Sequence, residues 1–258
     1  MTLPLAVQAA LLFAAALAGG AMNSVAGGGS FLVFPALVMT GVAPINANAT
    51  TTVALWPGSI ASVGAYRSEL SRARHARLFS LISLAGGVAG AVLLLHTPSA
   101  TFSRLIPFLL LLATLLFAFS GRITTWLRAV RGKDGASPHQ SLLVIAALQF
   151  IISVYGGFFG AGIGILMLAM LGLMGMENIH EMNALKTLLA SCINGIAVVT
   201  FVVAQAVVWP QAILMLIGSV AGGYGGARLA LRVEPRLVRR LIIAIGLIMT
   251  AYFFARLV

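Results

Sequence analysis

Long apolar runs with almost no charge inside them fill most of this sequence, and they constrain its fold more than any motif does. Only 8% of the 258 residues are charged, and 60% are hydrophobic. A soluble domain carries about 25% charged residues, so this chain cannot cover its own surface in water. The strands of a membrane barrel alternate over ~10 residues, whereas these runs are continuous. The sequence therefore predicts an all-α integral membrane protein, folded as a polytopic helical bundle.

The apolar runs are separated by glycines, prolines and short polar turns. We expect helices over residues 3–25, 30–40, 49–66, 78–95 and 102–120, and again over 141–159, 163–176, 184–208, 212–231 and 237–254. A membrane-spanning helix needs about 20 residues, so the runs at 30–40 and 163–176 are short or broken helices that either cross or re-enter. The predicted organisation is a first membrane repeat (1–121), a basic cytoplasmic linker (122–140) and a second membrane repeat (141–258).

The second half of the sequence repeats the first at a shift of about 135 residues, which indicates a duplication. The matching residues are Gly27 with Gly162, Gly29 with Gly164, Asn48 with Asn183, and Thr52 with Thr187. A shift longer by one residue places Gly86 on Gly222 and Gly90 on Gly226. One such match between glycine-rich apolar segments has no value, but several at a nearly constant offset favour duplication over chance.

The positive charge of the chain lies mostly between the apolar runs. A net charge of +11 comes from 16 basic and 5 acidic residues. Placed in turns, this charge follows the positive-inside rule and does not indicate nucleic-acid binding. If every run counts as a crossing, the second half is inverted, and the basic stretches 67–77, 121–140 and 228–240 share one side. Re-entrant short runs would give parallel halves and split these stretches, so we predict inverted repeats with both termini facing outward.

Each half contains a glycine-rich break before its short apolar run. A break leaves N–H groups unpaired at the start of the next helix, and the positive end of the helix dipole favours an anion there. We therefore predict that the two breaks face each other and bind a small anion, although glycines also serve close helix packing. The candidate residues at the breaks are Gly27, Gly28, Gly29, Ser30, Gly162 and Gly164.

Uncharged polar side chains follow each break at the start of the next long run. Asn48 and Asn183 are candidate ligands, although an asparagine at a helix start commonly caps it. Thr51, Thr52 and Thr187 can donate to an oxyanion or bond their own backbone one turn back. Asn194 is a further candidate because a buried amide in an apolar run is costly.

Lys186 is the sharpest single candidate, at the position in the second half that corresponds to Thr51. An intramembrane lysine is a functional hypothesis by default, and its alternative is a side chain that snorkels to the interface. Facing a cavity, Lys186 would supply one full positive charge to an anion. The preceding residues Glu177, His180 and Glu181 form either an ordinary solvated loop or a proton relay.

The pattern GGGSFLVFPALVMTGVAPINANATTTVA, followed by a basic turn and a glycine-rich helix, resembles the sulfite exporter (TauE/SafE) family of membrane permeases. The second half departs from this pattern, with Met170 at the position equivalent to Pro35. The resemblance implies a duplicated bacterial inner-membrane transporter for sulfite, an organosulfonate or a related sulfur oxyanion. The inverted repeats themselves predict alternating access, and the positive-inside rule predicts cytoplasmic basic loops and periplasmic termini.

Other functional classes lack their motifs in this sequence. There is no G-x-x-x-x-G-K-[ST], no H-E-x-x-H and no G-x-S-x-G, so neither an ATPase nor an intramembrane enzyme is predicted. No cofactor and no metal site is expected. The expected partners are a small anionic substrate and the lipid bilayer, and no nucleic acid is expected. The sequence is compatible with a homo-oligomer. An anion channel of the same architecture, or a transporter of an unrelated solute, is the alternative function.

Overall fold

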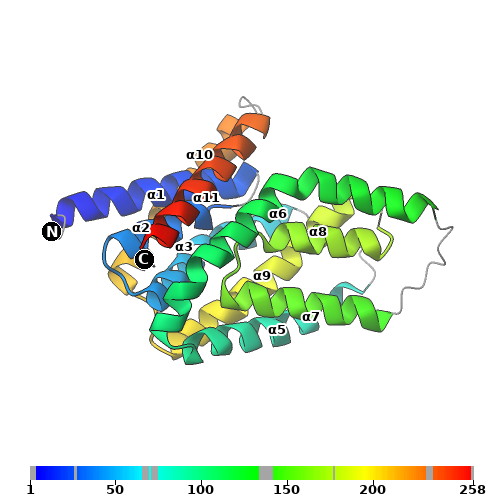
Figure 1. Cartoon of the computed structure of the whole chain (residues 1–258), viewed down its shortest axis with the longest axis horizontal. Coiled ribbons are helices and arrows are strands. Elements are labelled where there is room, and N and C mark those ends of the chain that lie inside the picture. The colour runs from blue at the N-terminus through cyan, green and yellow to red at the C-terminus, as the bar shows by residue number, and fades with distance from the viewer. Residues whose placement is uncertain are drawn as a thin grey trace.

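A computed structural model describes residues 4–25, 28–65, 70, 75–133, 142–176, 178–230 and 235–256, all in helices and short connections without strands (Figure 1). The first half contains α1 (Leu5–Val25), α2 (Ser30–Met39), α3 (Pro44–Ala65), α5 (Ala76–His96) and α6 (Ser99–Lys133). The second half contains α7 (Leu142–Phe158), α8 (Ile163–Leu173), α9 (Ile179–Val203), α10 (Trp209–Ala230) and α11 (Pro235–Ala255). The predicted all-helical bundle is confirmed.

The helix boundaries differ from the apolar runs where polar residues enter a helix. The structure starts α3 at Pro44 and α9 at Ile179, so the expected starts at residues 49 and 184 are wrong. Likewise α6 continues into the expected linker as far as Lys133, and residues 134–140 lie outside the described part of the chain. Within the described residues, four helices are long and apolar enough to cross a membrane: those in segments 5–23, 76–96, 99–122 and 179–203. The short apolar helices α2 and α8 keep their predicted lengths closely.

The helices pair in a pattern that repeats when the two halves are exchanged. Helix α1 packs along α10, and its counterpart α7 packs along α5, the counterpart of α10. In the same way α3 contacts α10 while α9 contacts α5, and α2 contacts α11 while α8 contacts α6. The pairs α3–α9 and α6–α11 map onto themselves. Such self-paired elements are expected on a pseudo-two-fold axis. In Figure 1, α1 runs from left to right and α7 from right to left.

Glycines at repeat-equivalent positions allow the closest helix contacts. A Cβ atom on Gly222 of α10 would collide with the carbonyl oxygen of Leu17 in α1. A Cβ atom on Gly86 of α5 would lie 2.9 Å from the carbonyl oxygen of Phe150 in α7. Both helix pairs therefore approach more closely than any larger residue permits at these two places. These two glycines therefore serve close helix packing.

Helices α3 and α9 carry matching internal hydrogen bonds. The Thr52 hydroxyl donates to the Asn48 carbonyl at 2.9 Å, and the Thr187 hydroxyl donates to the Asn183 carbonyl at 2.7 Å. These two bonds join equivalent residues of the two halves, because Asn48 and Thr52 correspond to Asn183 and Thr187. The polar residues after each break thus lie in the first turns of helices that contact each other.

Candidate functional site

Asn48 and Asn183 lie inside helices rather than at helix caps. The cap of α9 is Asn178, whose side chain accepts from the N–H groups of His180 and Glu181. The capping role considered for Asn48 and Asn183 is therefore wrong, because both helices start earlier than their apolar runs. The Asn48 amide instead donates at 3.1 Å to the carbonyl of Phe158, at the end of α7. It ties α3 of one half to the break of the other.

Three threonines were candidates, and the structure separates one of them from the other two. The hydroxyls of Thr52 and Thr187 donate to backbone carbonyls one turn back in their own helices, which is the alternative to donation to an oxyanion. Thr51 is only 3% exposed, and its Oγ1 atom has no hydrogen-bond partner among the described residues. A buried hydroxyl without a partner is costly. Thr51 shares a helix face with Asn48, three residues earlier, so its hydroxyl is the better candidate donor for a ligand.

The first glycine break is fastened to α1. Gly28 has a φ of +98°, and the N–H of Gly29 donates at 3.0 Å to Oδ1 of Asn23. A Cβ atom on Gly29 would collide with the carbonyl oxygen of Gly19, so the backbone of the break touches the backbone of α1 there. Ser30 is the first residue of α2, and Gly27 lies outside the described residues. Asn23, which sequence reasoning missed, therefore satisfies one donor of this break.

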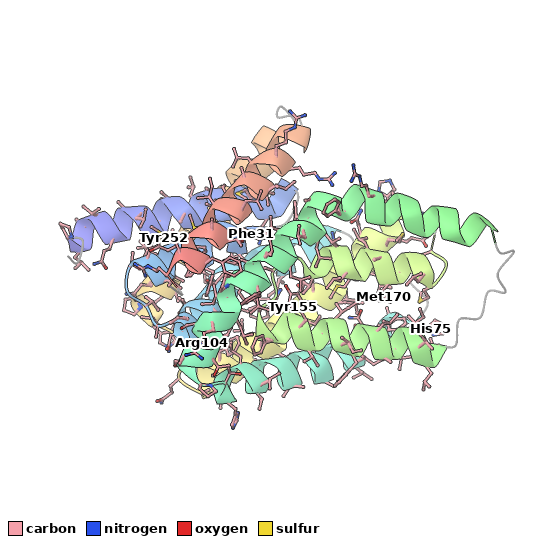
Figure 2. The ribbon with its side chains drawn as sticks, viewed as in Figure 1. Phe31, His75, Arg104, Tyr155, Met170 and Tyr252 are labelled. Carbon is pink, nitrogen blue, oxygen red and sulfur yellow. The ribbon has the colours of Figure 1, made fainter. Side chains whose placement is uncertain are left out.

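The second glycine break runs from Phe158 to Ile163, between α7 and α8. Gly160 and Gly162 both have a φ of +79°. Gly162 is the N-cap residue of α8, and no side chain caps this helix start. The Tyr155 hydroxyl donates at 2.8 Å to the carbonyl of Ala161 and holds the break in shape. Figure 2 shows Tyr155 near the middle of the view, and Phe159 and Ala161 of the break are buried.

Three of the predicted polar residues surround this second break. Asn48 bonds the Phe158 carbonyl, and Oδ1 of Asn194 lies 3.9 Å from the position of a Cβ atom on Gly160. Cδ of Lys186 lies 3.4 Å from the position of a Cβ atom on Gly164. Helix α2 packs on α1, α3 and α11, whereas α8 packs on α6, α7 and α9. The two short helices thus pack mainly on different neighbours, and the predicted facing of the two breaks stays a prediction.

Lys186 is half-buried in the first third of α9. Its Nζ atom donates at 3.1 Å to Oδ1 of Asn183, one turn earlier on the same helix. Among the residues that the structure describes, Glu181 is the sole acid, and it lies near the exposed start of α9. The hydrogen-bond partner of Lys186 is thus a neutral amide, which orients the ammonium group without neutralising it.

The residues considered as a proton relay form the start of α9. Asn178 accepts from the His180 N–H at 2.9 Å and from the Glu181 N–H at 3.5 Å. The Asn178 amide also approaches the Glu181 carboxylate at 3.4 Å. Asn178 is thus a side-chain N-cap, which stabilises a helix start. The backbone N–H groups of His180 and Glu181 belong to this cap, Glu177 lies outside the described residues, and the proton relay stays a prediction.

Two more polar residues of α3 fasten the turn between α9 and α10. The Asn46 amide donates at 2.8 Å to the carbonyl of Ala206, and the fully buried Thr50 hydroxyl accepts the Val208 N–H at 3.1 Å. Their acceptor and donor belong to the other half of the chain, about 160 residues away. The two residues therefore satisfy backbone groups of that turn.

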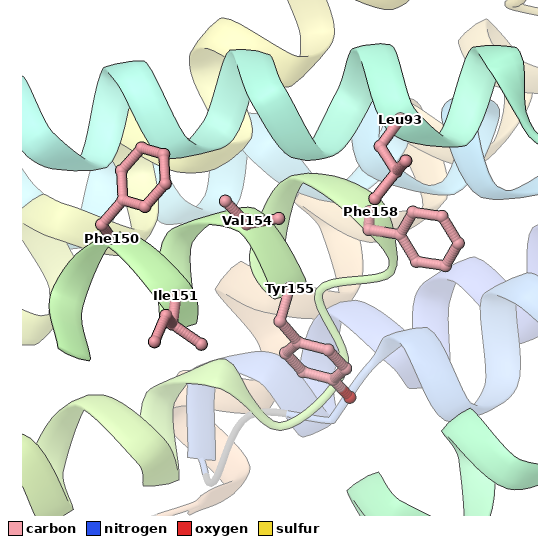
Figure 3. A pocket seen from close by; sticks show the side chains of 6 residues that line it. All are labelled: Leu93, Phe150, Ile151, Val154, Tyr155 and Phe158. Carbon is pink, nitrogen blue, oxygen red and sulfur yellow. The ribbon is translucent and has the colours of Figure 1, made fainter. Parts of the chain in front are cut away.

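An apolar hollow of about 350 Å³ lies at the surface between α5 and α7 (Figure 3). Its lining consists of Leu93, Phe150, Ile151, Val154, Tyr155 and Phe158. The single polar side-chain atom among these residues is the Tyr155 hydroxyl, which is bonded to Ala161. This hollow offers no charge or free donor to an anion, so it is distinct from the polar residues of α3 and α9.

The fold and the polar residues of α3 and α9 define a polytopic helical membrane protein. It is built from two equivalent sets of helices, each with a short helix after a glycine break. The chain belongs to the sulfite exporter TauE/SafE family, whose model matches residues 11–253.

Curated relatives match this chain over most of their length and are called probable membrane transporter proteins. The chain is 28% identical over 244 residues to a probable membrane transporter protein of Escherichia coli K12, YfcA, with 93% of this chain and 87% of the relative covered. It is 26% identical over 245 residues to a probable membrane transporter protein of Haemophilus influenzae, with 94% and 92% covered. A Sinorhizobium relative, the probable membrane transporter protein ORF9, is 28% identical over 245 residues. No solved structure matches the chain.

Proposed function

We propose that this protein is a secondary transporter that moves a small oxyanion across the bacterial inner membrane by alternating access. The observation that carries the proposal is Lys186, a half-buried cation in α9 whose stem packs on Gly164 near the uncapped start of α8. A lysine inside the apolar part of a membrane protein is expected to serve a ligand or an ion pathway. An anion is the ligand that this charge and this helix start both favour.

The polar atoms around the second break suit an oxyanion in particular. Lys186 offers an ammonium group, Thr51 offers a buried hydroxyl without a partner among the described residues, and the start of α8, which no side chain caps, adds the positive end of its helix dipole. An oxyanion has several acceptor oxygens and can accept from donors on different sides at once. The first half thus contributes a hydroxyl and the second half contributes the charge.

Sulfite or an organosulfonate is the proposed substrate. The family that matches the chain is named for sulfite export, and the curated relatives are called probable membrane transporter proteins. The charge and donors at the second break fit a small sulfur oxyanion, but they do not choose between one sulfonate and another.

The proposed topology has inverted repeats, cytoplasmic basic loops and periplasmic termini. The exchange of helix pairs between the halves and the opposite directions of α1 and α7 in Figure 1 support it. Figure 2 also places His75, before α5, and Arg104, near the start of α6, at opposite ends of the bundle. Helix α5 thus runs from one end of the bundle to the other, which both an inverted and a parallel arrangement require, so the support for inversion rests on the exchanged helix pairs and the opposite helix directions.

Reconstitution into liposomes tests the function directly. Uptake of sulfite, thiosulfate, sulfoacetate, taurine and sulfate is measured with and without a proton gradient, and empty liposomes serve as the control. We expect saturable uptake of at least one sulfur oxyanion. A flux that rises linearly with concentration and ignores the gradient would instead indicate a channel. Uptake equal to that of empty liposomes for every compound would contradict the proposal.

A further inference from the structure

Helices α3 and α9 each present a row of polar or hydrogen-bonding side chains on one face. On α3 the row consists of Asn48, Thr52, Trp56 and Ser59. On α9 it consists of Asn183, Thr187, Ser191 and Asn194. Spacings of four, four and three residues keep each row on a single helix face. Each member of one row corresponds to a member of the other at the shift that relates the halves.

The two rows meet at their third members. The indole N–H of Trp56 donates to the backbone carbonyl of Ser191 at 3.2 Å. Because Trp56 and Ser191 are equivalent positions, this bond lies where α3 and α9 cross and where the pairing pattern places the pseudo-two-fold axis. The indole packs closely on α9 at this point. A Cβ atom on Gly195 of α9 would lie only 2.9 Å from Cζ2 of the ring.

The polar atoms at the crossing are not fully used by the fold. A helix carbonyl can accept two hydrogen bonds, so the α9 backbone does not need the indole as a donor. The Ser191 hydroxyl is buried, and among the described residues it has no hydrogen-bond partner. In contrast, Thr187 and Thr200 of the same helix bond carbonyls one turn back. An unpaired hydroxyl beside a bond that the helix does not require indicates a place where a ligand can bind.

We infer that Trp56 is the central gate of the transport route and a direct donor to the transported anion, an inference that rests on the proposed function. With its N–H on the Ser191 carbonyl, the indole closes the route between the two polar rows. When the anion reaches the crossing, the N–H turns from this carbonyl to an anion oxygen, and the Ser191 hydroxyl donates beside it. The ring thereby makes way for the anion and binds it in one movement.

Two variants of Trp56 separate the two roles. Trp56→Phe keeps an aromatic ring and removes the donor, so KM for the anion should rise roughly tenfold or more while the melting temperature of the purified protein is retained. Trp209→Phe, at the exposed start of α10, is the matched control and should leave KM unchanged. A KM for Trp56→Phe within twofold of the wild-type value would overturn the donor role.

Trp56→Ala tests the gate without any need for transport. In a background in which Cys192 is replaced by alanine, Thr52→Cys is exposed to a membrane-impermeant thiol reagent from either side of sealed vesicles. We expect labelling from one side with Trp56 present and from both sides in Trp56→Ala. Gly195→Ala, which displaces the ring, should act in the same way and serves if Trp56→Ala does not fold. Unchanged one-sided labelling would overturn the gate. If the wild type moves none of the anions, the proposed function fails, but this labelling still decides the gate.

Discussion

The ammonium nitrogen of Lys186 lies 3.1 Å from Oδ1 of Asn183, so a neutral amide orients the positive charge inside α9. A carboxylate in the same place would neutralise the lysine and leave little attraction for a substrate. An amide satisfies one of the three ammonium donors and leaves two for a ligand. The pair is therefore suited to bind an anion that arrives and leaves.

Replacement of Lys186 by alanine should weaken anion binding without removing the protein from the membrane. A hydrogen bond to a charged group contributes about 1.5–3 kcal/mol, so the dissociation constant should rise by roughly 10-fold to 100-fold. Binding to purified protein and uptake into liposomes both measure this. Arg104→Ala, which removes an exposed cation of α6, is the control and should bind normally. Wild-type transport by Lys186→Ala would remove the lysine from the site.

Thr51→Val should reduce transport while the protein stays as stable as the wild type, or becomes more stable. The substitution replaces a buried hydroxyl without a partner by a methyl group of the same size, which removes a desolvation cost of about 1 kcal/mol or more. Thr250→Val is the matched control, because that buried hydroxyl bonds the Gly246 carbonyl at 2.7 Å. Melting curves and uptake rates are compared for both. Unaltered KM in Thr51→Val would show that the hydroxyl does not reach the substrate.

Gly222→Ala should destabilise the contact between α1 and α10. The added Cβ atom meets the carbonyl of Leu17, and overpacking of this kind costs about 1–3 kcal/mol. Thermal unfolding in detergent measures the loss. Gly58→Ala, in α3, is the control, because nothing lies within 4 Å of a Cβ atom at that position. Equal melting temperatures for the two variants would argue against close α1–α10 packing.

Cysteine labelling in intact cells tests the inverted topology. Single cysteines at Ser71 and Arg236 should both be accessible from the cytoplasm, and one at Ser99, the first residue of α6, should be accessible from outside. The prediction follows from the positive-inside rule applied to halves with an odd number of crossings. Opposite accessibility of Ser71 and Arg236 would instead support parallel halves.

The architecture could be predicted from the sequence because its causes are local. Apolar runs, glycine breaks and basic turns predict helices, their ends and their repetition, and the short helices α2 and α8 follow directly from them. The starts of α3 and α9 differ from the expected ones because polar residues were assigned to the preceding turns. In α3, Asn46 and Asn48 instead donate to backbone carbonyls of the other half and are tolerated inside the helix.

The contacts between the halves could not be predicted, because they depend on which distant carbonyl each side chain meets. The acceptor of Asn48 is Phe158, and the acceptor of Trp56 is Ser191. A tryptophan in an apolar run does not stand out in the sequence as a hydrogen-bond donor. Its one available clue is that it occupies the position equivalent to Ser191, in the third place of a row that is polar in both halves.

Counterflow in liposomes tests the central claim most directly. Vesicles that contain the protein are loaded with unlabelled sulfite and diluted into a trace of labelled sulfite, and the same is done with Lys186→Ala. The account predicts that internal sulfite accelerates a saturable entry of the label, and that this acceleration is lost in the variant. Entry that does not depend on internal sulfite, or that is the same in Lys186→Ala, would contradict it.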